Sequence, residues 1–121
     1  MPPMAPMAPA ASMADLVRLA QGFGSGELAD WQKLMRYLHF HEEFTSKSQC
    51  RKALKTVWIN IVDFLEAILS NGELRFFGNH YALGRYTVRT GKFFPKRSMP
   101  KGSPLRTLFT DMSHLRPRGH G

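Results

Sequence analysis

Hydrophobic and polar residues follow a helical period in the first half of the chain. One apolar face recurs at i, i+3, i+4 and i+7 and consists of Trp31, Leu34, Met35 and Leu38. This spacing predicts an amphipathic helix over residues 30–43, with the side chain of Asp30 as its N-cap. A shorter helix is expected over residues 14–21, ahead of the glycine-rich run at 22–27.

The same period predicts a second, longer helix over residues 45–70. Thr45 or Ser46 can cap its start, and Asn71-Gly72 is expected to end it because this pair tolerates the left-handed conformation. Its apolar positions are Cys50, Ala53, Leu54, Val57, Trp58, Ile61, Leu65, Ile68 and Leu69. The face is widened further by Ile59, Val62 and Phe64. One small helix cannot cover so wide a face, so we expect a second packing surface, which a homodimer would provide.

Beyond this helix the period changes from 3.6 to 2, which is typical of β-strands. Residues 74–77 and 83–89 predict two strands. A third strand ending near Phe109 is expected to pair with residues around 86–94, forming a long hairpin with its tip near 98–101. The expected fold class is therefore α+β, with two N-terminal helices, a three-stranded antiparallel sheet carrying an extended basic β-arm, and a short C-terminal tail.

Length and composition limit the class of protein. With 121 residues, 43% of them hydrophobic, the chain is expected to form one packed domain, which excludes a multidomain enzyme. We expect a Pro/Met/Ala-rich extension and glycine-rich linker at 1–29, a binding domain at 30–116 and a basic tail at 117–121. A single cysteine, Cys50, excludes an intrachain disulfide, and no apolar run reaches the length of a membrane span. We therefore expect an intracellular protein without a membrane anchor.

Positive charge is concentrated toward the C-terminus. Residues 1–84 hold eight basic and eight acidic side chains, whereas residues 85–121 hold nine basic ones and Asp111 as the only acid. Aromatic and leucine residues separate these cations. The pattern favours a polyanionic partner, nucleic acid above all, and the alternative of a solvated basic segment stays open.

Catalytic and metal-binding groups are sparse. His39 and His41 lie on an expected helix at i and i+2, where side chains face apart and do not share a metal easily. Glu42 and Glu43 diverge in the same way, and Cys50 has no histidine at helical spacing. We therefore expect neither an enzyme, nor a metal site, nor a cofactor.

Motifs in the C-terminal half suggest a family. Residues 83–89, Leu-Gly-Arg-Tyr-Thr-Val-Arg, combine a glycine with a following aromatic and end in Val-Arg. Residues 97–102, Arg-Ser-Met-Pro-Lys-Gly, fit an arm tip, and Phe109 followed by Leu115-Arg116 fits a closing segment. Together these motifs resemble the bacterial histone-like DNA-bending proteins, HU and integration host factor, over about residues 30–116. The proline at the tip stands one place later than in that family, and the returning strand is shorter.

The resemblance implies an intertwined homodimer that binds and bends double-stranded DNA in a nucleoid, with little sequence specificity. Its arms would enter the minor groove, with Met99 or Pro100 as the apolar wedge. The residues implied to contact nucleic acid are Arg85, Arg89, Lys92, Lys96, Arg97, Met99, Pro100, Lys101, Arg106 and Arg116. The alternative is a structural rRNA-binding subunit of a large ribonucleoprotein, such as a mitochondrial ribosome, with a repurposed HU-like fold and neighbouring protein subunits as partners.

Overall fold

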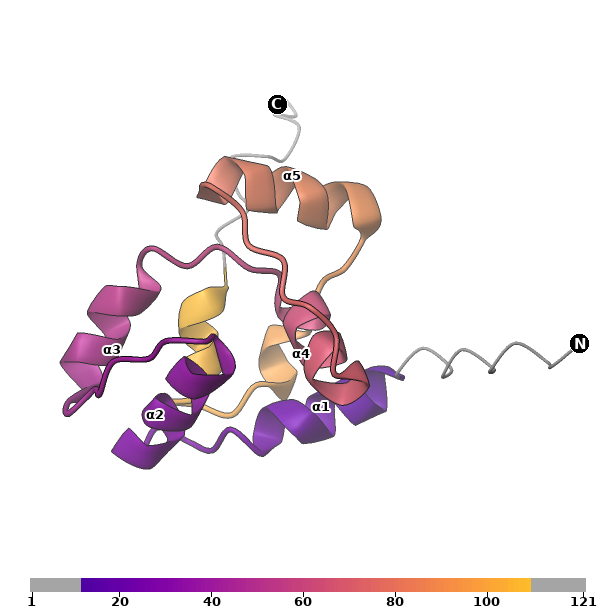
Figure 1. Ribbon diagram of the computed structural model, residues 1–121. Coiled ribbons are helices and arrows are strands. Elements are labelled where there is room, and N and C mark those ends of the chain that lie inside the picture. Colours follow the sequence, from indigo (N-terminus) through magenta and orange to yellow (C-terminus); the bar gives the residue numbers. More distant parts are fainter. Residues whose placement is uncertain (1–11, 110–121) are drawn as a thin grey trace, which may run out of the picture.

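The computed structural model describes residues 12–109, which form helices and connecting segments without a strand. The elements are α1 (Met13–Gln21), α2 (Leu28–Tyr37), α3 (Lys47–Leu54), α4 (Ile61–Ser70), α5 (His80–Thr90) and two 3-10 helices, η1 (Lys96–Ser98) and η2 (Pro104–Leu108). In Figure 1, α5 lies across the top of the molecule, and the other α-helices lie below it.

Side-chain caps mark where helices begin, and left-handed residues mark where α4 and α5 end. Ser12 accepts a hydrogen bond from the backbone N–H of Asp15 at the start of α1, and Asn60 and Asn79 cap α4 and α5 in the same way. The left-handed residues that end α4 and α5 are Asn71, with φ 56°, and Gly91, with φ 69°.

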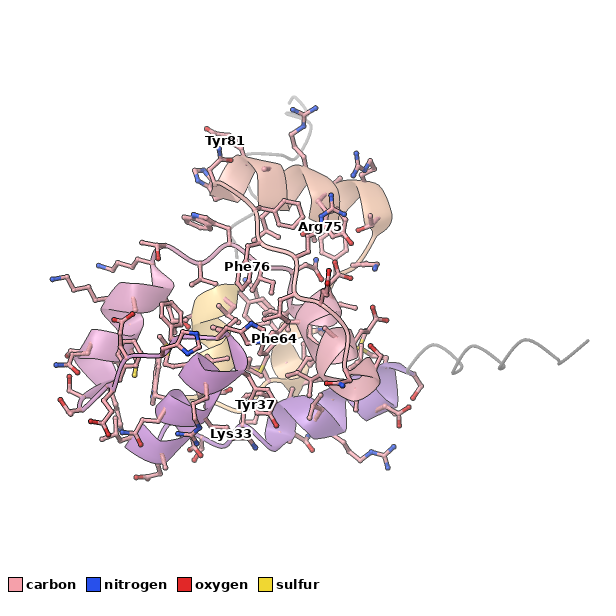
Figure 2. All side chains as sticks on the ribbon, in the orientation of Figure 1. Lys33, Tyr37, Phe64, Arg75, Phe76 and Tyr81 are labelled. Atoms are coloured by element: carbon pink, nitrogen blue, oxygen red, sulfur yellow. The ribbon has the colours of Figure 1, made fainter. Side chains whose placement is uncertain are left out.

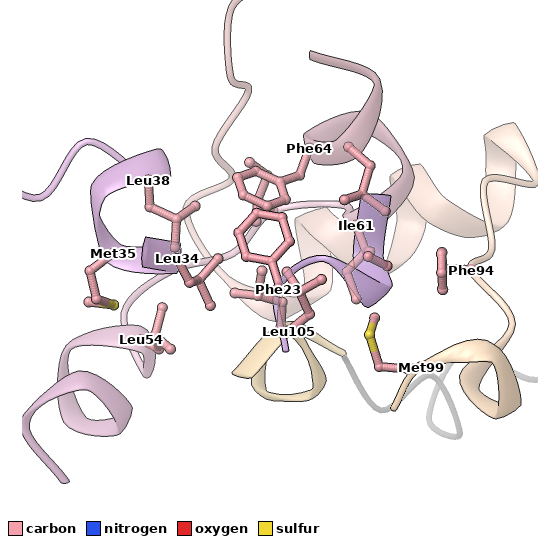
Figure 3. Packing of buried hydrophobic residues seen from close by; sticks show 14 of the residues in the cluster. Phe23, Leu34, Met35, Leu38, Leu54, Ile61, Phe64, Phe94, Met99 and Leu105 are labelled. Carbon is pink, nitrogen blue, oxygen red and sulfur yellow. The ribbon is translucent and has the colours of Figure 1, made fainter. Parts of the chain in front are cut away.

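Phe23 is the centre of the hydrophobic core. Its ring is fully buried and lies 5.9 Å, centre to centre, from the ring of Phe64 in α4. Figure 3 shows Leu34 of α2 and Leu105 of η2 on its other sides. The core therefore combines residues from the first and the last described elements.

Two glycines allow the loops around Phe23 and before η2 to touch. Gly26 has φ 116° and Gly102 has φ 81°, a region that favours glycine. A Cβ on Gly26 would lie 2.5 Å from the carbonyl oxygen of Gly102, and a Cβ on Gly102 would lie 2.3 Å from that of Ser25. Both positions therefore lack a side chain for steric reasons as well as conformational ones.

The expected α+β, HU-like fold is not formed, because the sheet and its arm are absent from residues 12–109. Residues 83–89, expected as a strand, lie inside α5, where Leu83, Tyr86 and Thr87 are buried at helical spacing. The caps at Asn79 and Gly91 favour this helix over a seven-residue strand. The expected arm is replaced by η1, η2 and the turns around them, which bury Phe94, Met99, Leu105 and Leu108 in the core.

The expected helix over 45–70 is two helices, α3 and α4, separated by residues 55–60. The break occurs where the Asn60 side chain caps α4, and α3 starts after Ser46, one of the two expected caps. The residues that widened the apolar face, Ile59, Val62 and Phe64, are all buried within a single copy. The apolar surplus that suggested a homodimer is therefore covered within one chain.

Other helix boundaries agree with the sequence pattern only in part. Helix α1 and the stop at Asn71 are as expected, but α2 ends at Tyr37, before left-handed His39 with φ 69°. Its N-cap is Glu27, and Asp30, the expected cap, is the N3 partner in a capping box.

The folded unit starts earlier than the expected boundary at residue 29. Leu16 and Ala20 of α1 are buried together with Phe23, so residues of the expected linker belong to the core. The expected tail at 117–121 lies outside the described residues. None of the helices within residues 12–109 has the length and apolar character needed to cross a membrane.

Candidate nucleic-acid interface

The charged residues divide the described chain into two parts. Residues 12–73 contain seven basic and eight acidic side chains, whereas residues 74–109 contain eight basic and no acidic ones. The eight are Arg75, Arg85, Arg89, Lys92, Lys96, Arg97, Lys101 and Arg106. A segment with this composition attracts polyanions wherever its cations are exposed and unpaired.

Two of the eight cations are held by other groups of the protein. Lys92 Nζ lies 2.6 Å from a carboxylate oxygen of Asp63 and 3.8 Å from one of Glu66. The guanidinium of Arg106 donates to the carbonyl oxygens of Pro100 and Met99, at 3.1 and 3.0 Å. Both were expected to contact nucleic acid, and the structure places them in contacts that hold its own turns together.

The other six cations have no carboxylate partner within residues 12–109, and all are exposed. Arg85 and Arg89 lie on α5, and Arg75 lies in the segment between α4 and α5, against the ring of Tyr86. The remaining three, Lys96, Arg97 and Lys101, lie on η1 or in the turn after it, and Lys96 Nζ is 5.4 Å from the ring centre of Phe109. All of these except Arg75 were expected site residues, and they form two groups instead of one arm.

Met99 and Pro100 are not arranged as a wedge. Met99 is 2% exposed and packs in the core near Phe94, as Figure 3 shows. Pro100 is partly buried, and its carbonyl oxygen accepts hydrogen bonds from Ser103 N–H and from Arg106. Arg116, the last expected contact, lies outside the described residues.

Helix α5 presents a continuous outer face. Tyr81, Arg85, Val88 and Arg89 are spaced by three and four residues, so they share one side of the helix. Tyr81 is 55% exposed and Val88 50% exposed, although both carry large apolar groups. Figure 2 shows Tyr81 on the upper side of α5 and Arg75 below the helix. Exposed apolar residues between arginines are typical of a contact surface.

The inner face of α5 is fixed by a buried polar junction. Asn60, only 4% exposed, donates from Nδ2 to the Thr87 hydroxyl at 3.0 Å and to the carbonyl oxygen of Lys92 at 2.9 Å. Its Oδ1 accepts from the backbone N–H of Asp63 at 3.0 Å, which is the cap of α4. One side chain thus joins the start of α4 to the middle of α5 and to the residue beyond its end.

Tyr86 carries a second connection between α5 and α4. Its hydroxyl donates to Asp63, the same carboxylate that binds Lys92. Burial raises the pKa of the Tyr86 hydroxyl, and the hydrogen bond to Asp63 raises it further. The hydrogen bond to Asp63 also raises the pKa of Lys92, against the opposing effect of burial. The Asp63 carboxylate therefore binds both the Tyr86 hydroxyl and the Lys92 ammonium, and these contacts hold α5 in a defined orientation.

Arg75 and Arg89 approach the same aromatic ring. Their guanidinium carbons lie 5.0 and 6.0 Å from the ring centre of Tyr86, and that of Arg75 is also 5.2 Å from Phe77. Arg75 was not among the expected site residues because it falls before the basic last third of the chain. The absence of any acidic residue over 74–109 is the sequence signal that includes it.

Comparisons with known proteins do not add a family. A scan against protein-family models, a search of curated proteins and a search of solved structures each found no match to this chain. Function is therefore argued from the surface itself.

A surface hollow of about 650 Å³ lies beside the loop after α2. Its lining includes Arg36 and His39 as well as Glu42 and Glu43. The hollow therefore carries both signs of charge and lacks the single sign that distinguishes the surface of α5.

Proposed function

We propose that this protein binds double-stranded DNA through α5, with Arg75 and Arg89 as the main phosphate-binding side chains and Arg85 between the helix and the duplex on the same surface. The observation that carries the proposal is the run of 36 residues, 74–109, with eight cations and no anion, from which three exposed arginines gather on or beside α5. Arginines in this setting neutralise phosphates and release counterions.

The shape of the surface favours DNA over RNA. Helix α5 has 11 residues, which corresponds to a rod about 16 Å long. The major groove of B-form DNA, about 12 Å wide, admits a helix, whereas the deep and narrow major groove of A-form RNA does not. Bending is not part of the proposal, because the expected arm is not formed and Met99 is buried.

The proposal is tested by the salt dependence of binding. Fluorescence anisotropy of a labelled duplex is measured over a range of salt concentrations with the wild type and with an Arg75→Gln, Arg85→Gln, Arg89→Gln triple variant. In the triple variant the phosphate contacts of Arg75 and Arg89 are lost and the loss of Arg85 removes a third charge from the interface, so the slope of log K against log salt is expected to become shallower by about 2 to 3. Affinity at moderate salt is expected to fall at least about tenfold, by the same counterion argument.

A charge-matched control lies on α3 and its C-cap. Lys47, Lys52 and Lys55 are also exposed, and their replacement by glutamine removes the same three charges. This control is expected to keep most of the salt slope. Equal losses in the two triple variants would show that α5 is not the binding surface. Tighter binding to structured RNA than to the DNA duplex would instead favour the ribosomal-RNA alternative.

A further inference from the structure

Arg85 and Arg89 occupy different positions on the outer face of α5. At 3.6 residues per turn, the exposed residues follow one another around the helix as Val88, Tyr81, Arg85 and Arg89. Arg85 therefore stands in the middle of the exposed stripe. Arg89 stands at its border, on the side of Tyr86, where Arg75 also lies.

These positions correspond to different parts of a DNA groove. When a helix lies in the major groove, the centre of its outer face meets the base edges and its borders meet the sugar-phosphate walls. Arg75 and Arg89, gathered at the ring of Tyr86, are placed for phosphates. Arg85 is placed for bases, and exposed Val88 beside it offers an apolar contact of the kind made with a thymine methyl group.

We propose that α5 reads DNA sequence in the major groove and that Arg85 is its specificity-determining residue, selecting guanine. The inference rests on the proposed function and deepens it, since phosphate contacts alone give no sequence preference. Guanine presents two acceptors, O6 and N7, to the fork of a guanidinium. Arg85 is exposed and has no carboxylate partner within residues 12–109, so among the described residues no ion pair holds its side chain away from this contact.

The anchoring of α5 supports reading over loose association. Base recognition requires a helix held in one orientation, and the Asn60 and Asp63 contacts fix α5 on the side opposite Arg85.

The test is selection from a pool of duplexes with a randomised central segment, using the full chain. The wild type is expected to enrich a motif that contains an essential guanine. Arg85→Gln is expected to lose the preference for guanine at one position by about 5- to 150-fold, or to change it to adenine, whose N6 and N7 suit a glutamine amide. Neither effect requires a change of fold, and an unchanged circular dichroism spectrum of Arg85→Gln verifies that the variant is folded.

Arg89→Gln is the matched control. It is expected to keep the motif while weakening binding to all sequences and reducing the salt slope by about 1. Binding of the wild type to duplexes without an enriched motif would overturn the inference and leave the proposed function standing. A motif unchanged in Arg85→Gln would overturn the role of Arg85, and failure of the wild type to bind any duplex would overturn both proposals.

Discussion

Replacing Gly102 by alanine tests the contact between the two loops that close the core. At φ 81° an alanine is strained by about 1–2 kcal/mol, and its lower entropy in the unfolded chain offsets about 0.4–1 kcal/mol of this. The added Cβ would also lie 2.3 Å from the carbonyl oxygen of Ser25. Forcing two backbones apart in a packed region is comparable to overpacking, which costs about 1–3 kcal/mol. Gly102→Ala is therefore expected to destabilise the protein by about 1–4.6 kcal/mol, of which the overpacking contributes about 1–3 kcal/mol.

Gly91→Ala is the matched comparison. Gly91 has a similar φ of 69°, but among residues 12–109 a Cβ there would meet no atom within 4 Å beyond its own chain neighbours. Only the conformational strain and the same entropic offset apply, so the free energy of unfolding is expected to fall by about 0–1.6 kcal/mol. Urea unfolding followed by the helical circular dichroism signal measures both values.

The result that would refute this reasoning is an equal loss of stability in the two variants, within about 0.5 kcal/mol. It would mean that the loops carrying Gly26 and Gly102 do not touch in solution. A Gly26→Ala, Gly102→Ala double variant gives an independent check. Because one separation of the loops relieves both clashes, its effect is expected to be smaller than the sum of the single effects.

Three further predictions concern the junction under α5 and the core. Asn60→Ser keeps a cap for α4 but loses the hydrogen bonds to Thr87 and to the carbonyl oxygen of Lys92, so it is expected to lower the free energy of unfolding by about 1–3 kcal/mol. Asn60→Ala also loses the cap and is expected to lower it by about 1 kcal/mol more, and urea unfolding measures both values. Because the folded-state pKa values of Tyr86 and Lys92 are raised from 10.0 and 10.5, their stabilisation is complete below about pH 10 and is lost as pH rises through the raised values. The free energy of unfolding, measured from about pH 8 to pH 11, is therefore expected to decline above about pH 10. The decline is expected to be less steep in a Tyr86→Phe, Lys92→Met variant. An identical decline in both proteins would show that these two groups do not cause it. Cys50 is buried, and burial also raises the pKa of its thiol. A thiol reagent is therefore expected to react with it only as fast as the protein opens. Immediate modification of the native protein would be inconsistent with the place of Cys50 in the core.

Local signals in the sequence were sufficient for some elements. The i, i+3, i+4 spacing around Trp31 predicted α2, and Asn71-Gly72 predicted the end of α4. These succeed because each depends on neighbouring residues only. The concentration of charge near Arg85 and Arg89 was also visible, because composition does not depend on the fold.

The fold class was wrong because a short amphipathic segment is ambiguous. In residues 83–89 the apolar positions satisfy a period of 2, yet Leu83, Tyr86 and Thr87 also satisfy the helical spacing that the structure uses. The caps at Asn79 and Gly91 distinguish the two, and they outweigh the resemblance to a strand motif.

Other features depend on contacts between distant parts of the chain. The burial of Met99 and the hydrogen bonds of Arg106 to the turn before it follow from how η1 and η2 pack. Likewise, Asn60 meets Thr87 across 27 positions of sequence, which no local period encodes.

The position of η2 has a consequence for the newly made protein. Leu105, fully buried, packs near Phe23 and Leu34, and η2 itself contacts α2 and α3. During synthesis the helices α1 to α3 are complete well before η2 is made, so their apolar faces stay uncovered until the last of the described elements has been synthesised. Nascent chains that stop short of η2 would expose these faces and become substrates for chaperones or for aggregation.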